Sequence, residues 1–320
     1  MDKNTLYIVV PCYNEEAVLP ISADVFVQKI RGFVDKGAIS PSSRVLFVDD
    51  GSKDKTWKII QDLCENNIEC CGVKLSKNCG HQNALMAGMS SAMVHADMIV
   101  TIDADLQDDI NCIDKMIEKY SEGYEVVYGV RSSRKTDSGF KRWTAQLYYK
   151  FLKILGVDIV YNHADFRLLS KRACESLFAF GEVNLFLRGI IRLVGFKNTT
   201  VEYERNVRQA GESKYPLKKM LSFAIDGVTS FSIKPVRFIS VMGFLSLILT
   251  VAYATYTVIG CFMGNTVFGW SSLILSVWFF GSAILISIGV IGEYIGKIYL
   301  ETKHRPRYFI EDYLNLHDKN

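Results

Sequence analysis

Short apolar runs alternate with longer segments of helical pattern in the N-terminal two thirds of the chain. The apolar runs are rich in Val and Ile and predict strands at residues 6–10, 45–48, 98–102 and 126–128. The segments between them predict helices near 17–35, 55–66, 82–95 and 110–121. Strands that alternate with helices indicate an α/β domain with a largely parallel sheet, in which ligands lie at the carboxyl ends of the strands.

Two long apolar runs follow this domain, at about 236–263 and 267–295. Each exceeds the roughly 20 residues that a helix needs to cross a bilayer, and only an uncharged turn at 264–266 separates them. Basic residues flank the pair on both outer sides, so the positive-inside rule places both ends of the hairpin in the cytoplasm. The flanking residues are Lys234, Arg237, Lys297, Lys303, Arg305 and Arg307. A buried helical hairpin of a soluble protein is the alternative interpretation.

These patterns divide the chain into four parts. A cytoplasmic α/β domain at 1–215 leads through an interfacial juxtamembrane helix at 216–234 into a transmembrane hairpin at 235–296, and a cytoplasmic basic tail follows at 297–320. Basic and aromatic residues are also interleaved at 140–155. That interleaving is typical of a helix on a membrane surface, or of an ordinary packed helix with a charged face.

Composition restricts the partners and the compartment. The net charge of +3 over 320 residues is too small to indicate a nucleic-acid partner. None of the eight cysteines forms a CxxC pair, which favours reduced, structural thiols. The first residues lack the charged, apolar and cleavage regions of a signal peptide. We therefore expect an integral protein of the inner or plasma membrane whose α/β domain stays in the cytoplasm.

The loops after the first two strands lack the signatures of two common nucleotide-binding folds. The first strand runs into PCYNEE at 11–16, where a dinucleotide-binding fold would have GxGxxG, and this argues against a dehydrogenase. Residues 51–56 do not have the GxxxxGK[ST] spacing of a P-loop. The second strand ends in Asp49-Asp50-Gly51. Its carboxylates either accept hydrogen bonds from a base or ribose, or belong to a turn with a helix cap.

The strand at 98–102 ends in DADLQD at 103–108. A spacing of two puts Asp103 and Asp105 on the same side of a chain that stays extended, so their oxygens can converge on a hard divalent cation. Mg²⁺ or Mn²⁺ at this point would neutralise a diphosphate leaving group. An acidic start of the next helix is the alternative, and we expect Asp108 or Asp109 to cap that helix.

Eight motifs occur along the chain in a fixed order. They are PCYNEE, VDDGSKDKT, KNCGHQNALMAG, DADLQD, YGVR, ADFRLLS, NLFLRG and RQAGESKYP. In this order the chain resembles inverting family 2 glycosyltransferases of the GT-A fold, and among them the polyprenyl-phosphate group, which contains bactoprenol glucosyltransferases and dolichol-phosphate mannose synthases. The resemblance covers nearly the whole chain, and two C-terminal spans fit the bactoprenol type best. It implies a Rossmann-like GT-A domain with a two-helix transmembrane hairpin.

The resemblance also implies roles for residues at matching positions. For the nucleotide-sugar these are Pro11, Tyr13, Glu15 and Asp50 at the nucleoside, Asp103 and Ala104 near ribose and phosphate, and Arg208 and Lys214 at the diphosphate. Asp105 and Gln107 would hold the metal, Mg²⁺ or Mn²⁺. Standing alone, Arg208 and Lys214 would be interpreted as solvated loop charges. Because relatives assemble as tetramers, a homotetramer is an assembly to test.

The acceptor side depends on two further residues. Arg131 resembles the arginine that binds the acceptor phosphate, and its planar donor fork suits an anionic oxygen. Asp165 lies where relatives with hydroxyl acceptors have a base. A lipid phosphate is already largely anionic at neutral pH, so we expect Asp165 to have a positioning or structural role ahead of a catalytic one. His81 and His163 show no metal-ligand spacing and are interpreted as loop or packing residues.

We therefore expect transfer of a hexose, glucose from UDP-glucose in the first place, to undecaprenyl phosphate, giving a lipid-monophosphate sugar for modification of cell-envelope glycans. GDP-mannose and UDP-N-acetylhexosamine are alternative donors. A processive polysaccharide synthase is a rival, but Arg142-Trp143 lacks the glutamine of a QxxRW segment. A non-catalytic membrane binding protein would have no use for the acidic motif, and two spans with almost no charge make a poor transport path.

Overall fold

The computed structural model describes residues 3–132, 163–182, 187–204 and 269–316, with short groups of residues between 236 and 259. The chain divides into two compact units. The first, here called the sheet unit, comprises Met1–Tyr149, Asp158–Pro216 and His304–Asn320. The second, called the span unit, comprises Lys150–Val157 and Leu217–Lys303.

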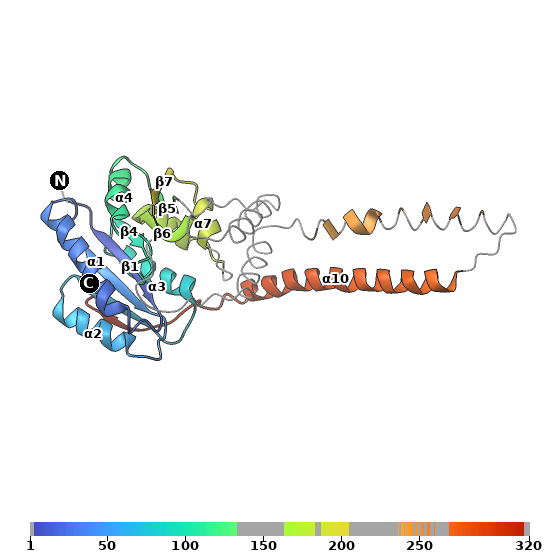
Figure 1. Cartoon of the computed structure of the whole chain (residues 1–320), viewed down its shortest axis with the longest axis horizontal. Helices are drawn as coiled ribbons and strands as arrows, with labels where there is room; N and C mark the ends of the chain where they lie inside the picture. Colours follow the sequence, from blue (N-terminus) through green and yellow to red (C-terminus); the bar gives the residue numbers. More distant parts are fainter. Residues whose placement is uncertain are drawn as a thin grey trace. The chain divides into compact units, whose positions relative to one another are not determined.

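An eight-stranded sheet forms the centre of the sheet unit (Figure 1), in the order β7-β5-β6-β4-β1-β2-β3-β8. Strands β1 to β4 are mutually parallel, whereas β6 is antiparallel to both β4 and β5. The strands are β1 Leu6–Cys12, β2 Arg44–Asp49, β3 Cys70–Leu75, β4 Met98–Thr101, β5 Val126–Arg131, β6 His163–Ser170, β7 Asn198–Tyr203 and β8 Ile310–Leu314. The predicted α/β class with a mostly parallel sheet is confirmed, and so are the strands predicted from the apolar runs.

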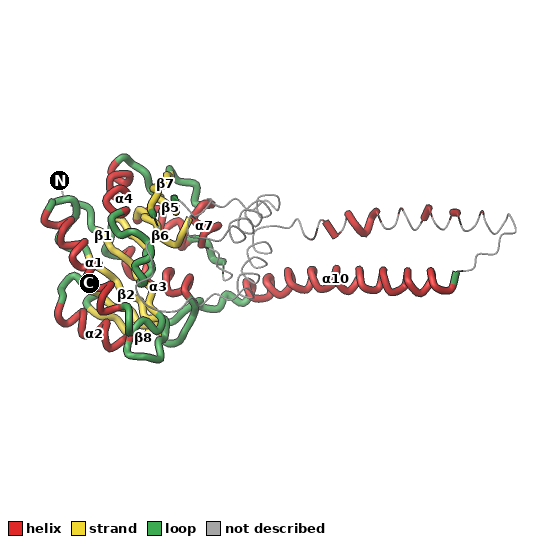
Figure 2. Tube along the Cα trace, in the orientation of Figure 1, coloured by secondary structure: helices red, strands yellow, loops and turns green. Residues whose placement is uncertain are grey.

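Helices cover both faces of this sheet, as Figure 2 shows by the red segments on either side of the yellow strands. Side chains of α1, α2 and α4 join one buried cluster with the sheet, while α3 contacts β1 and β2 and packs beside α6. Their bounds are α1 Leu19–Asp35, α2 Thr56–Asn66, α3 His81–Met93, α4 Cys112–Ser121, α6 Lys171–Phe178 and α7 Leu187–Leu193. Because both faces are covered, every residue of β1 is buried, which explains its continuous apolar run.

Helix α3 lies unusually close to the sheet at Gly88. A Cβ added to Gly88 would stand 2.4 Å from Cγ1 of Val9 and 2.7 Å from Cγ2 of Val48. The absence of a side chain therefore sets the distance between α3 and the strands, and with it the position of the N-terminus of α3 near the strand ends.

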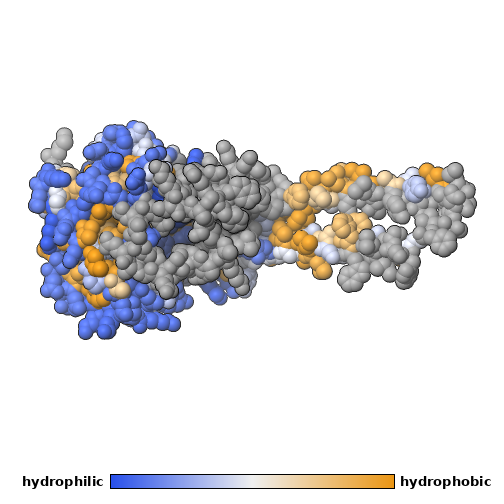
Figure 3. Space-filling model, viewed as in Figure 1, coloured by the Kyte–Doolittle hydropathy of each residue, from blue (hydrophilic) through white to orange (hydrophobic). Residues whose placement is uncertain are grey.

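The span unit contains the long helix α10, Trp270–Thr302. Its segment Phe279–Thr302 is long and apolar enough to cross a membrane. The most apolar window of this segment contains no buried residue. Large side chains such as Phe279, Leu285 and Ile286 are more than half exposed, and exposed hydrophobic residues appear in orange in Figure 3. Full exposure of such a stretch is unfavourable in water and suits lipid.

The second predicted run thus forms a helix, with its C-terminal end seven residues beyond the expected 295. The first run, 236–263, is described only in short helical groups that make up half of it, so the hairpin stays a prediction. The segments 140–155 and 216–234 also lie outside the described residues.

The C-terminal segment is not simply a basic tail. Residues Ile310–Leu314 form β8, which pairs antiparallel with β3 at one edge of the sheet. Asn315, at φ 56°, donates from Nδ2 to the carbonyl oxygens of Cys64 at 2.7 Å and Cys70 at 3.0 Å. The chain therefore returns to the sheet unit after α10, a connection that the local sequence pattern did not predict.

All seven cysteines among the described residues are free thiols, and six of them are buried. Burial raises the pKa of Cys70 and Cys112 to about 12, so these side chains remain protonated and act as small apolar residues. The six buried thiols agree with the expectation of structural cysteines, Cys79 is only half-buried, and Cys261 lies outside the described residues.

Candidate active site

The loops that follow β1 and β2 brace each other at the carboxyl edge of the sheet. The amide of Asn14 donates to Oγ of Ser52 at 3.0 Å, and the amide of Lys53 donates to Oδ1 of Asn14 at 2.9 Å. The amide of Glu15 donates to Oγ1 of Thr56 at 2.9 Å. Asn14 itself has φ 53°, a left-handed conformation that asparagine tolerates. The two loops form one ledge beside the strand ends.

Three predicted nucleoside-binding residues lie on this ledge or at its base. Pro11 is buried in β1, directly opposite Val48 of β2. Tyr13 and Glu15 are half-buried in the loop that follows. The structure thus brings these residues together with the end of β2, and their contacts with a nucleoside remain a prediction.

Asp50 anchors the loop before α3. Its side chain is buried and accepts hydrogen bonds from the amides of Cys79 at 2.7 Å and Gly80 at 3.0 Å. Burial raises the pKa of Asp50, although these two amides and His81 act against the shift. Neither Asp49 nor Asp50 caps α2, because Lys55 precedes that helix and Asp54 accepts from its first amide. One carboxylate thus connects the end of β2 to the start of α3.

The expected extended geometry of Asp103 and Asp105 is wrong. Strand β4 ends at Thr101, and the chain turns at residues 104 and 105. Leu106 is buried at φ 53°, which a leucine adopts only where its surroundings enforce it. Oδ1 of Asp105 accepts a hydrogen bond from the amide of Gln107 at 3.1 Å. A turn, not a strand, therefore brings Asp105 close to Gln107, and Ala104 is buried beneath it.

The donor set of this turn fits a hard cation only with outside ligands. Among the described residues no group of three or more His, Cys, Asp or Glu side chains is arranged to hold a metal. The carboxylate of Asp105 and the amide oxygen of Gln107 are hard oxygen donors, which suit Mg²⁺ or Mn²⁺ when phosphate oxygens and water complete the shell. The residues present fit a metal that is shared with a diphosphate.

His81, the first residue of α3, stands between two carboxylates. Its Nε2 lies 3.5 Å from Oδ1 of Asp103 and 3.7 Å from Oδ2 of Asp165. Burial would lower the pKa of His81, but a hydrogen bond to Asp165 and the charge of Asp103 outweigh it and raise this pKa to about 9. Burial also raises the pKa of Asp103 to about 6, with His81 acting against it. At neutral pH His81 is therefore a cation that links β4 to β6.

Asp165 in β6 is held by two arginines as well as His81. Its carboxylate accepts from Nη2 of Arg167, and from Nε and Nη2 of Arg188 at 3.3 and 3.0 Å. Burial acts to raise the pKa of Asp165, yet Arg188, His81 and Arg167 together hold it well below the usual range. A carboxylate so strongly stabilised as an anion is a weak proton acceptor. The geometry supports a positioning role for Asp165.

Arg167 itself is the largest fully buried side chain of the described residues. Its Nε and Nη1 have no hydrogen-bond partner in the part of the chain that the structure describes. A buried guanidinium with one carboxylate partner depends strongly on that partner, because an unpaired buried charge is costly. Asp165 therefore also stabilises the fold around β6.

Arg131 at the end of β5 is oriented by a second buried carboxylate. Its Nη2 donates to Oδ1 of Asp108 at 3.3 Å, and its Nε donates to the hydroxyl of Tyr203 at 3.3 Å. The Tyr203 hydroxyl also donates to Asp108. Burial would lower the pKa of Arg131, but Asp108 and Tyr203 raise it. Among the described residues its hydrogen-bond partners are Asp108 and Tyr203, which leaves three of its five N–H donors for an anionic oxygen, as the prediction of an acceptor-phosphate arginine requires.

Asp108 is thus not a helix cap. Helix α4 begins at Cys112 after Asn111, whose side chain makes no capping bond, and Asp109 instead accepts from the amide of Asn111 at 3.0 Å. Of the two residues expected to cap this helix, Asp109 makes a capping-type bond in the turn that leads into α4, and Asp108 does not. That turn leaves Asp108 buried beside Arg131.

Sequence reasoning missed several members of this network. His81 was interpreted as a loop or packing residue, and Arg188, Tyr203 and Asp108 were given no role in binding. The motifs KNCGHQNALMAG and NLFLRG contain His81 and Arg188, so the order of motifs held a signal, but only the fold shows that both side chains meet Asp165. Arg208 and Lys214 lie outside the described residues, and their assignment to the diphosphate stays a prediction.

Comparison with known proteins agrees with this arrangement. A family model described as "Glycosyl transferase family 2" matches residues 7–178. The uncharacterized glycosyltransferase YkoT of Bacillus subtilis is 49% identical over 306 residues, which cover 96% of this chain and 91% of that protein. The bactoprenol glucosyl transferase of Shigella phage SfV is 39% identical over 95% of this chain and 97% of its own. A prophage bactoprenol glucosyl transferase homolog of Escherichia coli is also 39% identical, with the same two coverages.

Proposed function

This chain belongs to glycosyl transferase family 2, and from that premise we propose that it transfers glucose from UDP-glucose to a polyprenyl phosphate, with inversion at the anomeric carbon. The observation that carries the proposal is the 39% identity, over 95% of the chain, to the bactoprenol glucosyl transferase of phage SfV. The product is a polyprenyl monophosphate sugar used to modify cell-envelope glycans. The acceptor we propose is undecaprenyl phosphate.

Arg131 binds the acceptor phosphate in this proposal. Asp108 and Tyr203 fix its guanidinium, which reduces the entropy lost when it binds an anion. A planar fork with free donors can hold two phosphate oxygens and leave the third to attack. Because the acceptor oxygen is already anionic near neutral pH, the attack needs no general base.

The donor lies along the edge formed by β1, β2 and β4. Pro11, Tyr13, Glu15 and Asp50 hold the nucleoside, and Asp103 with Ala104 lies beside the ribose and phosphate. Arg208 and Lys214 stabilise the diphosphate as it leaves. Asp105 and Gln107 would hold Mg²⁺ or Mn²⁺, which supplies positive charge to the diphosphate.

His81 and Asp165 position these groups. The histidinium between Asp103 and Asp165 reduces the repulsion between two carboxylates, so Asp103 can stay in place beside the donor. Asp165 is occupied by Arg188 and Arg167, which supports orientation of this network over proton transfer.

The membrane part delivers the acceptor. We propose two spans with the sheet unit and both ends of the chain in the cytoplasm of the inner or plasma membrane, supported by the exposed apolar stretch of α10. A lipid acceptor requires an active site near the membrane surface. A homotetramer is the assembly that we would test first.

The deciding experiment supplies detergent-purified full-length protein with undecaprenyl phosphate, Mn²⁺ and one nucleotide-sugar at a time. We expect the lipid to gain the mass of one hexose with UDP-glucose. A gain only with GDP-mannose or UDP-N-acetylglucosamine would move the assignment to that donor, and no gain with any donor in folded protein would refute the lipid acceptor. Addition of EDTA is expected to abolish the gain, and excess Mn²⁺ to restore it.

A further inference from the structure

A hollow of about 420 Å³ lies in the sheet unit, and its lining includes none of the residues assigned to the active site. One wall comes from the end of α6 and the segment after it, and includes Phe178 and Phe180. The other comes from the connection between α10 and β8 and includes His304, Arg305, Arg307 and Tyr308. Both walls belong to the same compact unit, so the hollow is a feature of one folded body.

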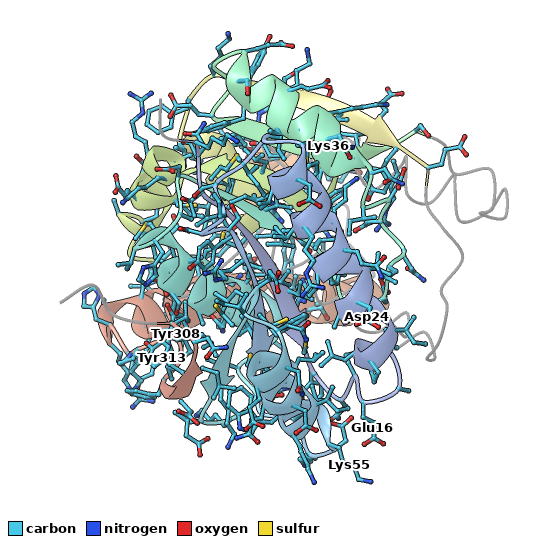
Figure 4. All side chains as sticks on the ribbon, turned by 90° about the vertical axis from the view of Figure 1, so that its left-hand side faces the viewer. Glu16, Asp24, Lys36, Lys55, Tyr308 and Tyr313 are labelled. Atoms are coloured by element: carbon cyan, nitrogen blue, oxygen red, sulfur yellow. The ribbon has the colours of Figure 1, made fainter. Side chains whose placement is uncertain are left out.

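Hydrogen bonds fix the connection that forms this hollow. Nη2 of Arg307 donates to the carbonyl oxygen of Phe180 at 2.9 Å and joins the two walls. The hydroxyl of Tyr308 lies 2.9 Å from the hydroxyl of Ser90 in α3, and the amide of Ser76 donates to the carbonyl of Phe309 at 3.0 Å. Figure 4 shows Tyr308 next to Tyr313 of β8, far across this view from Lys36. The pairing of β8 with β3 fixes the C-terminal end of the same connection.

The hollow is suited to an anion by its charge. Its described lining contains Arg305, Arg307 and His304 and no Asp or Glu. Arg305 is exposed, and neither arginine forms an ion pair with another described residue. Phe178 and Phe180 provide an apolar side next to these cations. A phosphate ester that carries a short apolar part matches both properties.

One basic residue of this lining, Arg305, lies close in the chain to the end of the candidate span. The wall that contains it begins at His304, two residues after Thr302, where the candidate span Phe279–Thr302 ends. Three residues of extended chain reach about 10 Å at most, so Arg305 stays within that distance of the end of the span. The polar head-group layer of a membrane has a similar depth, about 5 to 8 Å on each side. Arg305 is therefore within reach of lipid phosphates.

We propose that this hollow binds the phosphate head group of an anionic glycerophospholipid, as a site distinct from the acceptor site at Arg131. The bound lipid connects the end of α10 to the sheet unit through Arg305 and Arg307. It takes no part in the transfer, so the proposal goes beyond the proposed function and does not depend on turnover.

The test measures lipid bound to full-length protein by native mass spectrometry, without any nucleotide-sugar. The protein is released from detergent micelles that contain equal amounts of phosphatidylglycerol and phosphatidylcholine. We expect phosphatidylglycerol to remain bound, and Arg305→Gln to weaken its binding about fivefold, the contribution of one basic residue at an anionic surface. Arg305→Glu should weaken it further, while the bond from Arg307 to Phe180 stays in place.

A matched control removes positive charge elsewhere. The control carries Lys36→Gln at the C-terminal end of α1 and Lys58→Gln in α2, both at exposed positions. It should bind as much phosphatidylglycerol as the wild type. If this control lost as much bound phosphatidylglycerol as Arg305→Gln, only the net charge of the protein would matter, and the proposal would be overturned. The proposal would also be overturned if Arg305→Glu bound as much phosphatidylglycerol as the wild type.

Two competitors separate the sources of phosphate. If millimolar inorganic phosphate displaces phosphatidylglycerol, a free phosphate is the ligand and the lipid assignment fails. If undecaprenyl phosphate displaces it in the wild type and binds Arg305→Glu more weakly, the hollow is part of the acceptor site and the separate site is refuted. Unchanged binding of undecaprenyl phosphate to Arg305→Glu, with phosphatidylglycerol lost, supports the proposal even if no sugar is ever transferred.

Discussion

At the scale of single residues, two largely buried carboxylates orient the groups of the active site. Asp108 holds Arg131, and Asp165 holds Arg167, Arg188 and His81. Both carboxylates are largely shielded from water, so their ion pairs are stronger than exposed ones. Substitutions at these positions should therefore separate substrate binding from turnover and from stability.

Arg131→Ala is expected to raise the KM for polyprenyl phosphate at least tenfold and to leave the KM for the nucleotide-sugar within about twofold, because it removes a charged hydrogen bond to the acceptor alone. Steady-state kinetics with each substrate varied in turn measures the difference. Tyr203→Phe is the matched control, since it removes one orienting contact and keeps the guanidinium. Equal effects of Arg131→Ala on both KM values would contradict the assignment.

Asp165→Asn is expected to lower kcat by less than about a hundredfold, since general bases contribute about 100 to 10,000-fold and the acceptor oxygen needs none. The same substitution should lower the melting temperature, because Arg167 keeps its buried charge and loses its anionic partner. Single-turnover rates and thermal unfolding are measured on the same preparation. A loss of several orders of magnitude with little change in melting temperature would identify Asp165 as a base.

His81 makes stability depend on pH. Its pKa is raised to about 9 in the folded protein from an ordinary value of 6.5, so its protonated form stabilises the fold fully below pH 6.5. That contribution is lost as the pH rises through about 9. The melting temperature of wild type should therefore exceed that of His81→Gln most below pH 6.5 and converge with it above pH 9.

At the scale of helices and strands, the packing of α3 fixes the geometry of the edge. Gly88 lets the helix approach β1 and β2, and the N-terminus of α3 then carries His81 to Asp103 and Asp165. The loop before it is tied to β2 through Asp50. The distance between α3 and the sheet is thus coupled to the arrangement of charges at the site.

Gly88→Ala is expected to destabilise the protein by about 1 to 3 kcal/mol, because the new methyl group overlaps Val9 and Val48. Gly32→Ala in α1 is the matched control. No atom lies within 4 Å of its added Cβ, so alanine should be neutral or stabilise the helix by up to about 1 kcal/mol. The melting temperatures of the two variants are compared in detergent. A similar decrease of the melting temperature in both would show that the close approach of α3 at Gly88 does not affect stability.

Local pattern was sufficient for the elements whose period or composition is strong. The buried apolar runs of strands β1, β2 and β4 and helices α1 to α4 follow from their apolar spacing. Strand β3 was missed because Cys70-Cys71-Gly72 has weak strand propensity, and β7 was missed because it is half exposed and polar. The turn at Leu106 could not be predicted either, because it depends on tertiary contacts that hold a leucine at positive φ.

At the scale of the whole molecule, the order of strands depends on pairing between distant segments. β6 lies between β4 and β5, and β8 pairs with β3 from more than 200 positions away. No local property of the sequence near 310 specifies that partner. The contact of Arg188 with Asp165 was hidden for the same reason, since it arises only when α7 packs near the end of β6.

Asn315→Gly is expected to loosen this edge. It removes hydrogen bonds to the carbonyls of Cys64 and Cys70, worth about 1 kcal/mol each, while glycine accepts the positive φ. Hydrogen exchange should become faster in Cys70–Leu75, as read by mass spectrometry. Asn198→Gly at the opposite edge removes one exposed bond to Phe196 and should leave that segment unchanged. Unaltered exchange in both would show that the C-terminal anchor is dispensable.

The position of β8 after α10 has a consequence for biosynthesis. A ribosome makes β1 to β7 first, then the apolar helix, and only then the strand that covers the edge of β3. Until translation reaches Leu314, that edge has unpaired backbone groups of the kind that attract other strands. The sheet is therefore completed only after the apolar helix has been translated, and a chain interrupted within that helix has an open β3 edge that proteases and chaperones can recognise.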